Sequence, residues 1–406
     1  DWNYILKIAG YPNNGGKVDV GQPEPVHEVE KILATAPLDQ LKAYMELAVI
    51  SSSAGMLSDA FSNRKFEYTK VAYGVQQQQP RWKRALSFVQ GIMGEAVGKL
   101  YVQKYFPESS KERMIQLVKN LQSAFAQRIE ENTWMTAATK AKALEKLQAF
   151  DIKIGYPDKW QNMDSVFVID EAKSLLDNVK NVQEAASKYI ISKRWGKPVD
   201  KKLWHMTPQT VNAYYDPSTN SINFPAAILQ SPFFDPEVDD AANYGAIGAV
   251  IGHEMSHGFD DQGCQFDKEG NMKNWWTDED KKNYDARTKV LVDWFNQQEV
   301  IPGLKVNGEK TLGENIGDNG GLNVAYRALE NSMKQNPLTD KDGFTPSQRF
   351  FLAWGRVWAS NVAPQFVAYI VNSDVHSPNV SRVNAALPMI DAWYKAFDIK
   401  EGDKLF

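Results

Sequence analysis

Two histidines in this sequence lie four residues apart and enclose a glutamate. His253, Glu254 and His257 form the pattern His-Glu-x-x-His within an apolar segment that is typical of a helix. Residues four apart lie on the same face of a helix, so both imidazoles can bind one metal ion. A glutamate beside the metal can hold a metal-bound water and accept its proton. The pattern therefore predicts hydrolysis by metal-activated water.

A catalytic zinc typically takes three protein ligands and leaves one position for water, so a third ligand is needed. A histidine six residues after His257 is excluded, because that position is Gly263. A carboxylate from a second helix is the other common solution, and Glu314 and Asp318 lie four residues apart further along the chain. One of these carboxylates can bind the metal while the other accepts a hydrogen bond from a metal-binding imidazole. Asp260 can support His257 in the same way.

The composition is that of an ordinary folded protein. The chain has 406 residues, 43% of them hydrophobic and 24% charged, with a net charge of −4. The length allows two or three domains, and the charge gives no reason to expect a nucleic-acid partner. The sequence contains no run of 18 apolar residues, so we expect no transmembrane segment in this chain. The single cysteine, Cys264, excludes an internal disulfide and a cysteine-built zinc cluster.

The sequence patterns change near residue 200. Residues 1–200 consist mainly of helical patterns, and two apolar stripes predict ordinary core packing: Leu38, Leu41, Met45 and Ala48 in one, and Met114, Val118, Leu121, Phe125 and Ile129 in the other. Two short β-like runs, 211–215 and 221–224, flank a turn sequence and predict a hairpin. Helical segments follow. The predicted fold is mostly α with a smaller β component (α+β), in two domains, 1–200 and 201–406.

The sequence resembles the neprilysin and endothelin-converting-enzyme family of zinc metalloendopeptidases. Four blocks carry the resemblance in family order: residues 212–215 with 224–230, residues 253–263, residues 313–321, and residues 374–378 with Arg382. Similarity extends over essentially the whole chain. The resemblance implies a helical cap lobe at 1–200 and a thermolysin-like zinc catalytic lobe at 201–406, with the active-site cleft between the two lobes.

The resemblance also implies a role for each matching residue. One Zn²⁺ per chain would be bound by His253, His257 and Glu314, with Glu254 as the general base. Asp318 matches the aspartate that orients the first histidine and is sometimes assigned as a proton donor, and Asp260 matches the partner of the second histidine. His376 matches the residue that stabilises the oxyanion. Arg382, Asn212 and Ala213 match the groups that hold the substrate backbone. The apolar pocket for the residue after the cleaved bond corresponds to Ile228, Phe233, Val357 and Trp358.

The expected function is zinc-dependent hydrolysis of small peptides at internal bonds, with a preference for a hydrophobic residue just after the cleaved bond. Two alternatives stay open. A non-catalytic peptide-binding protein would hold a structural zinc, which four protein ligands would close. An exopeptidase would need a site for a free terminus, and no such site is recognisable in the sequence.

The resemblance leads to two further expectations. The family extends much further upstream than this chain, so we expect an amino-terminal fragment of the same polypeptide as a partner, in addition to the peptide substrates. The many cysteines of animal members are missing, which indicates a bacterial protein. By the habit of the family, the expected location is extracytoplasmic (periplasmic, or secreted or at the surface), with the cytoplasm as the alternative.

Overall fold

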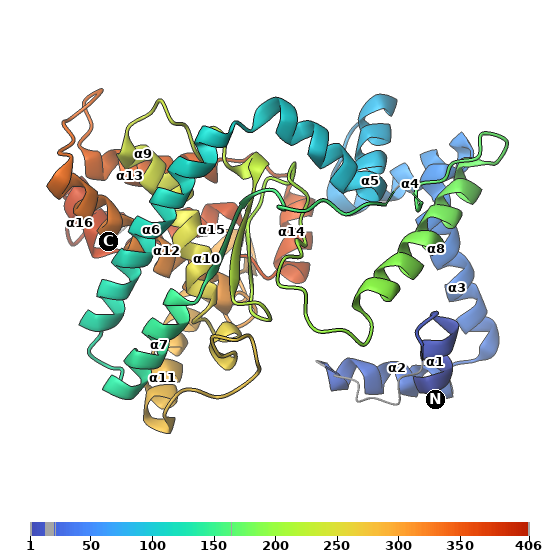
Figure 1. The fold of residues 1–406 in the computed structure, drawn as a ribbon, viewed down its shortest axis with the longest axis horizontal. Helices are drawn as coiled ribbons and strands as arrows, with labels where there is room; N and C mark the ends of the chain where they lie inside the picture. The colour runs from blue at the N-terminus through green and yellow to red at the C-terminus, as the bar shows by residue number, and fades with distance from the viewer. Residues whose placement is uncertain (1, 13–19, 21, 164, 405–406) are drawn as a thin grey trace. The chain divides into compact units, whose positions relative to one another are not determined.

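The computed structural model describes residues 2–12, 20, 22–163 and 165–404. The fold is mostly α-helical with a small β component, as the sequence predicted (Figure 1). The chain forms two compact units, one of residues 1–93 and 161–200 and one of residues 94–160 and 201–406. Residues 94–160 thus pack with the later part of the chain, although the sequence patterns change near residue 200. The division of the complete protein into a helical and a catalytic lobe stays a prediction.

The first unit is built of helices. They are α1 (Trp2–Ile8), α2 (Pro23–Thr35), α3 (Leu38–Ser53), α4 (Asp59–Tyr73), the start of α5 (Arg81–Tyr105) and α8 (Leu175–Arg194). Helix α5 is kinked at Met93, whose backbone is not helical (φ −116°, ψ 33°). The kink coincides with the end of the first segment of this unit.

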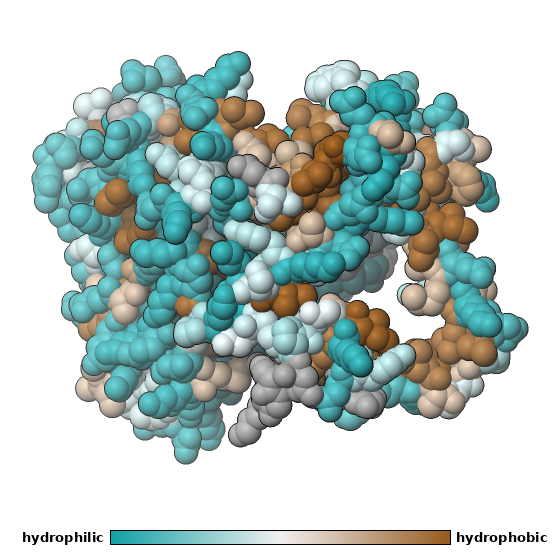
Figure 2. All heavy atoms as spheres, turned by 45° about the vertical axis from the view of Figure 1, so that its right-hand side comes forward, coloured by the Kyte–Doolittle hydropathy of each residue, from teal (hydrophilic) through white to brown (hydrophobic). Residues whose placement is uncertain are grey.

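The apolar stripe of α3 does not belong to a core, so the prediction of core packing is wrong for this helix. Leu38 and Met45 are 66% and 60% exposed, and neither α2 nor α3 contains a buried residue along its described length. Figure 2 shows apolar side chains on the surface of the molecule, and those of α2 and α3 are among the exposed ones. A helical period indicates that a helix has an apolar face, but it does not specify what that face contacts.

The second unit holds a small sheet and the remaining helices. Its elements are the rest of α5, α6 (Glu108–Glu131), α7 (Ala137–Gln148), β1 (Asp151–Gly155), β2 (Tyr214–Asp216), β3 (Ser221–Pro225), α9 (Asp240–Asn243), α10 (Ala249–His257), α11 (Asp278–Phe295), β4 (Glu299–Ile301), β5 (Leu304–Lys305), α12 (Leu312–Gln335), α13 (Pro346–Val357), α14 (Pro364–Ser373), α15 (Asn379–Asn384) and α16 (Asp391–Phe397). The stripe of α6 lies in the core as predicted, because Met114, Val118 and Leu121 are fully buried.

The larger sheet has the strand order β1-β3-β2, and β4 and β5 form a separate two-stranded sheet. Strands β2 and β3 pair antiparallel as the predicted hairpin, with Asp216 opposite Ser221. The turn between them places Asn220 in the left-handed region (φ 49°), which asparagine tolerates well. Strand β3 is buried along its length and also pairs in parallel with β1. The parallel strand β1 comes from the part of the chain for which helical patterns were expected.

Helices α10 and α12 pack against each other in the middle of this unit (Figure 1). Their contact depends on glycine: a Cβ at Gly321 would lie 2.4 Å from the carbonyl oxygen of Ala249, and one at Gly252 would lie 2.9 Å from Gly321 Cα. Without side chains at these positions the two backbones come close together. Within the described part of the chain, no helix combines the length and the apolar character needed to cross a membrane.

Candidate metal centre

Three potential metal ligands converge where α10 faces α12. Helix α10 carries His253 and His257 one turn apart, and the first turn of α12 carries Glu314. The two Nε2 atoms lie 3.0 Å apart, and Glu314 Oε2 lies 3.1 Å from Nε2 of His253 and 3.6 Å from Nε2 of His257. In the described residues these three form the group whose ligand atoms all lie within 4.8 Å of one another.

The other nitrogen of each imidazole contacts a carboxylate. His253 Nδ1 lies 2.8 Å from Asp318 Oδ1, and His257 Nδ1 lies 2.7 Å from Asp260 Oδ2. An ionised carboxylate only accepts hydrogen bonds, so each Nδ1 carries a proton, and in the neutral imidazole Nε2 then presents a lone pair. These contacts favour the tautomer in which both imidazoles can bind a metal through Nε2.

The arrangement of the three lone-pair donors fits a zinc ion. Two Nε2 atoms and a carboxylate oxygen face one another, and Glu314 Oε2 is buried without a hydrogen-bond partner. Ligands about 2.0–2.1 Å from a tetrahedral zinc lie about 3.3 Å from one another, and the distances of 3.0, 3.1 and 3.6 Å lie around that value. Two histidines and a glutamate are also a ligand set of catalytic zinc.

Asp318 is held from its other side by a buried arginine. Arg382 donates from Nε to Asp318 Oδ2 at 2.8 Å and from Nη2 to Oδ1 at 2.6 Å, and its guanidinium lies 3.8 Å from the ring centre of Trp358. Burial alone would raise the pKa of Asp318, but the charge and hydrogen bonds of Arg382 and the contact with His253 together outweigh burial and lower the pKa. Asp318 therefore stays ionised as the acceptor for His253. Within the described residues, Nη1 of Arg382 makes no hydrogen bond.

Glu254 lies on α10 directly after the first histidine and is 5% exposed. Burial raises the pKa of its carboxyl group, and the neighbouring His253 and His257 partly oppose this effect. Among the described residues no side chain or backbone group donates a hydrogen bond to it. A buried carboxylate with free lone pairs next to the metal ligands can bind a water and take its proton.

His376 approaches the carboxylate of Glu314 from the segment after α14. Its Nε2 lies 3.2 Å from Glu314 Oε2, and its Nδ1 lies 2.8 Å from Asp374 Oδ1. His376 is half exposed and is not part of the three-ligand group. Asp374 thus contacts Nδ1 of His376 in the way that Asp260 contacts Nδ1 of His257. No role for Asp374 was predicted from the sequence, although its position two residues before a candidate histidine was a usable signal.

The other predicted residues lie just before strand β2 and in or against the main apolar cluster. Asn212 and Ala213 precede β2, and Asn212 Oδ1 accepts a hydrogen bond from the Ala213 backbone at 2.9 Å. Ile228, Phe233, Val357 and Trp358 all belong to the main apolar cluster of this unit, where Ile228 is buried and the others are partly buried.

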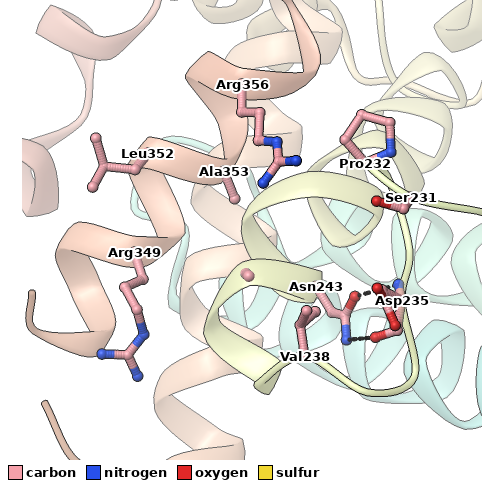
Figure 3. Close-up of a pocket in the computed structure, with 10 residues that line it drawn as sticks. Ser231, Pro232, Asp235, Val238, Asn243, Arg349, Leu352, Ala353 and Arg356 are labelled. Atoms are coloured by element: carbon pink, nitrogen blue, oxygen red, sulfur yellow. Dashed lines mark hydrogen bonds between the residues drawn. The ribbon is translucent and has the colours of Figure 1, made fainter. Parts of the chain in front are cut away.

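A separate pocket of about 230 Å³ lies on the outer face of α13 (Figure 3). Arg349, Leu352, Ala353 and Arg356 line it from α13. Asp235 and Asn243 on the opposite side hydrogen-bond each other, and Arg349 pairs with Asp239. The lining contains none of the converging ligands. The metal group is therefore the better candidate for the chemical centre.

The sequence profile of peptidase family M13 matches residues 212–406, and a second profile of the same family matches residues 1–157. The chain is 36% identical to a neutral endopeptidase of Lactobacillus helveticus over 97% of its length, and 34% identical to neprilysin of Homo sapiens over 96%. It covers 59% and 53% of those two proteins. The chain thus spans little more than half the length of these relatives.

Two solved structures are also similar to this chain. The zinc metalloprotease Zmp1 of Mycobacterium tuberculosis in complex with an inhibitor matches 95% of this chain with a TM-score of 0.90 and 43% identity, and 59% of that chain is covered. PepO from Lactobacillus rhamnosis HN001 matches 88% of this chain with a TM-score of 0.80 and 32% identity, and 55% of that chain is covered.

Proposed function

The chain belongs to peptidase family M13, and on that premise we propose that it provides the zinc centre of an endopeptidase that hydrolyses small peptides. The observation that carries the proposal is the convergence of His253, His257 and Glu314 with the buried Glu254 beside them. Two imidazoles and one carboxylate leave an open position on a zinc ion, and that position is what distinguishes catalytic from structural zinc.

Each residue of the centre has a task in this proposal. A zinc ion bound by the three ligands would act as a Lewis acid and lower the pKa of a water to about 7. Glu254 takes the proton of the attacking water and later passes it to the leaving amine. With a proton on both ring nitrogens, His376 donates from Nδ1 to Asp374 and from Nε2 to the developing oxyanion. Asp318 and Asp260 position the two ligand histidines.

The substrate is proposed to be an extended peptide. Strand β2 lies at an edge of the sheet, and the segment before it carries Asn212 and Ala213. An extended peptide can pair with such an edge through its backbone. The free Nη1 of Arg382 can donate to a peptide carbonyl while its other nitrogens hold Asp318. Ile228, Phe233, Val357 and Trp358 would favour a hydrophobic residue just after the cleaved bond.

Two alternatives are less well supported. A structural zinc needs a fourth protein ligand, and His376 does not join the three-ligand group. An exopeptidase needs groups that bind a free peptide terminus, and none of the residues given a role above is assigned to such binding. The bacterial relatives agree with a bacterial origin, and an extracytoplasmic location remains part of the proposal.

A peptide blocked at both termini and carrying a fluorophore and quencher on either side of one bond tests the function. We expect cleavage that stops after treatment with a zinc chelator and returns when one equivalent of zinc is added. Cleavage of a matched peptide with free termini, but not of the blocked one, would favour the exopeptidase. Zinc binding without cleavage of either peptide would overturn the proposal in favour of a structural metal.

A further inference from the structure

Lys146 is a fully buried lysine that the mechanism above does not use. It lies near the end of α7 and is 1% exposed. Its Nζ donates to the carbonyl oxygens of Gly258, Gly263 and Phe266, each at 2.7 Å. An ammonium group has three donors, so all of them are used by the backbone of one segment.

The surroundings of Lys146 are shaped for a cation. Its Nζ lies 5.7–5.9 Å from the ring centres of Tyr215, Phe259 and Trp275. No carboxylate forms a salt bridge with it in the described part of the chain. A buried charge is costly unless its donors are satisfied, and here neutral carbonyls and aromatic faces replace the hydration shell. Such an arrangement fixes the carbonyl groups in space, which a packed apolar side chain would not do.

The segment that Lys146 binds carries the carboxylate that supports His257. Asp260 lies between Gly258 and Gly263, and its Oδ1 accepts from the backbone of Gln262 at 2.9 Å and of Gly263 at 2.6 Å. Its Oδ2 contacts His257 Nδ1 at 2.7 Å. The turn is tightly closed, because a Cβ at Gly263 would lie 1.7 Å from the His257 carbonyl oxygen.

We propose that Lys146 is a positioning residue of the metal centre, whose ammonium holds the turn 258–266 closed so that Asp260 keeps His257 in its metal-binding orientation. The proposal rests on the proposed function through the role of His257 as a ligand. Helix α7, which carries Lys146, is itself held in place at its start. The threonines at the start of α7, Thr136 and Thr139, donate to the buried Asp280 of α11. The cation is thus carried by a helix whose first turn is also fixed to α11.

Zinc affinity of the folded protein, measured by competition with a chromogenic chelator, tests this role without any peptide. Lys146→Met keeps the length of the side chain and removes its donors, and we expect zinc binding to weaken about 10–100-fold. Lys142→Met on the exposed side of the same helix is the matched control and should bind zinc within twofold of the parent. Zinc affinity would still test the role of Lys146 if the chain cleaved no peptide.

A double variant separates positioning from general stability. If Lys146 acts through Asp260, then Lys146→Met should weaken zinc binding little further in the Asp260→Ala background, because coupled residues are not additive. Full additivity, or zinc affinity within twofold of the parent in folded Lys146→Met, would overturn the proposal. If the Met variant does not fold, Lys146→Arg and Lys146→Gln replace it. Each keeps a polar head but cannot bind three carbonyls in the same way, and parental zinc affinity in both would also overturn it.

Discussion

Asp318 holds His253 at 2.8 Å through the same oxygen that accepts a 2.6 Å hydrogen bond from Arg382. A single buried carboxylate therefore connects a metal-binding imidazole with a buried guanidinium. The charges compensate each other, since Asp318 and Arg382 pair through two hydrogen bonds. His253 is thereby oriented by a group that is itself fixed from the opposite side.

Glu254→Gln separates metal binding from catalysis. All three ligands remain, so the variant should keep one zinc per chain, while kcat should fall about 10²–10⁴-fold because no carboxylate accepts the water proton. Metal content by atomic absorption and peptide hydrolysis are measured on the same sample. Glu237→Gln, an exposed glutamate, serves as the control. A folded, zinc-loaded variant with a parental rate would show that the base is another residue.

Glu314→Ala should remove the zinc altogether. The substitution deletes one of three ligands from the first turn of α12, and two imidazoles alone would not hold the metal at stoichiometric levels during dialysis. Asp318→Ala should weaken binding only about 10–100-fold, because it removes support from His253 and not a ligand. Glu330→Ala, exposed on the same helix, should change nothing. One tightly bound zinc in Glu314→Ala would place the third ligand elsewhere.

Arg382→Met should destabilise the second unit strongly. It leaves the Asp318 carboxylate buried without its positive partner, which typically costs about 3–5 kcal/mol of unfolding free energy. Lysine cannot form the two-pronged contact, so Arg382→Lys should recover only part of the loss. Urea unfolding followed by tryptophan fluorescence gives the values. The exposed Arg356→Met is the control, and equal stability of the two methionine variants would contradict the importance of the pair.

The free energy of unfolding should depend on pH through the ionisation of Asp280. Burial opposes its ionisation, but the hydroxyl groups of Thr136, Thr139 and Thr277 outweigh this and lower its pKa to about 2. Because the folded-state pKa lies below the ordinary value, its contribution of about 2 kcal/mol is complete above about pH 4 and is lost as the pH falls through 2. Asp280→Asn should be less stable at pH 7 and lose less stability between pH 4 and 2.

Urea unfolding followed by tryptophan fluorescence at several pH values checks the Asp280 prediction. The control is Asp278→Asn, a substitution of an exposed aspartate in the same helical turn. That control should lose less than about 1 kcal/mol at pH 7 and keep the parental acid dependence. If Asp280→Asn shows the same slope as the parent between pH 4 and 2, the three threonine contacts do not stabilise the ionised carboxylate.

The sequence by itself was sufficient for features whose geometry is local. The four-residue spacing of His253 and His257 places both imidazoles on one helical face whatever surrounds the helix. The turn sequence between two β-like runs likewise predicted the β2–β3 hairpin. Glu314 required more than spacing, because its approach to the histidines depends on the contact of α10 with α12. The family resemblance supplied that relation.

Tertiary structure alone decided the remaining features. The stripe of α3 has the same period as that of α6, yet one is exposed and the other buried. Nothing in the local sequence around Lys146 indicates that its ammonium meets three carbonyls of a turn more than a hundred residues away. Periodicity and spacing describe neighbours along one element, whereas partners of a buried charge are selected by the packing of elements distant in sequence. The ligand set and the supporting Asp260 and Asp318 could therefore be predicted from the sequence, whereas the contact of Lys146 with the turn 258–266 could not.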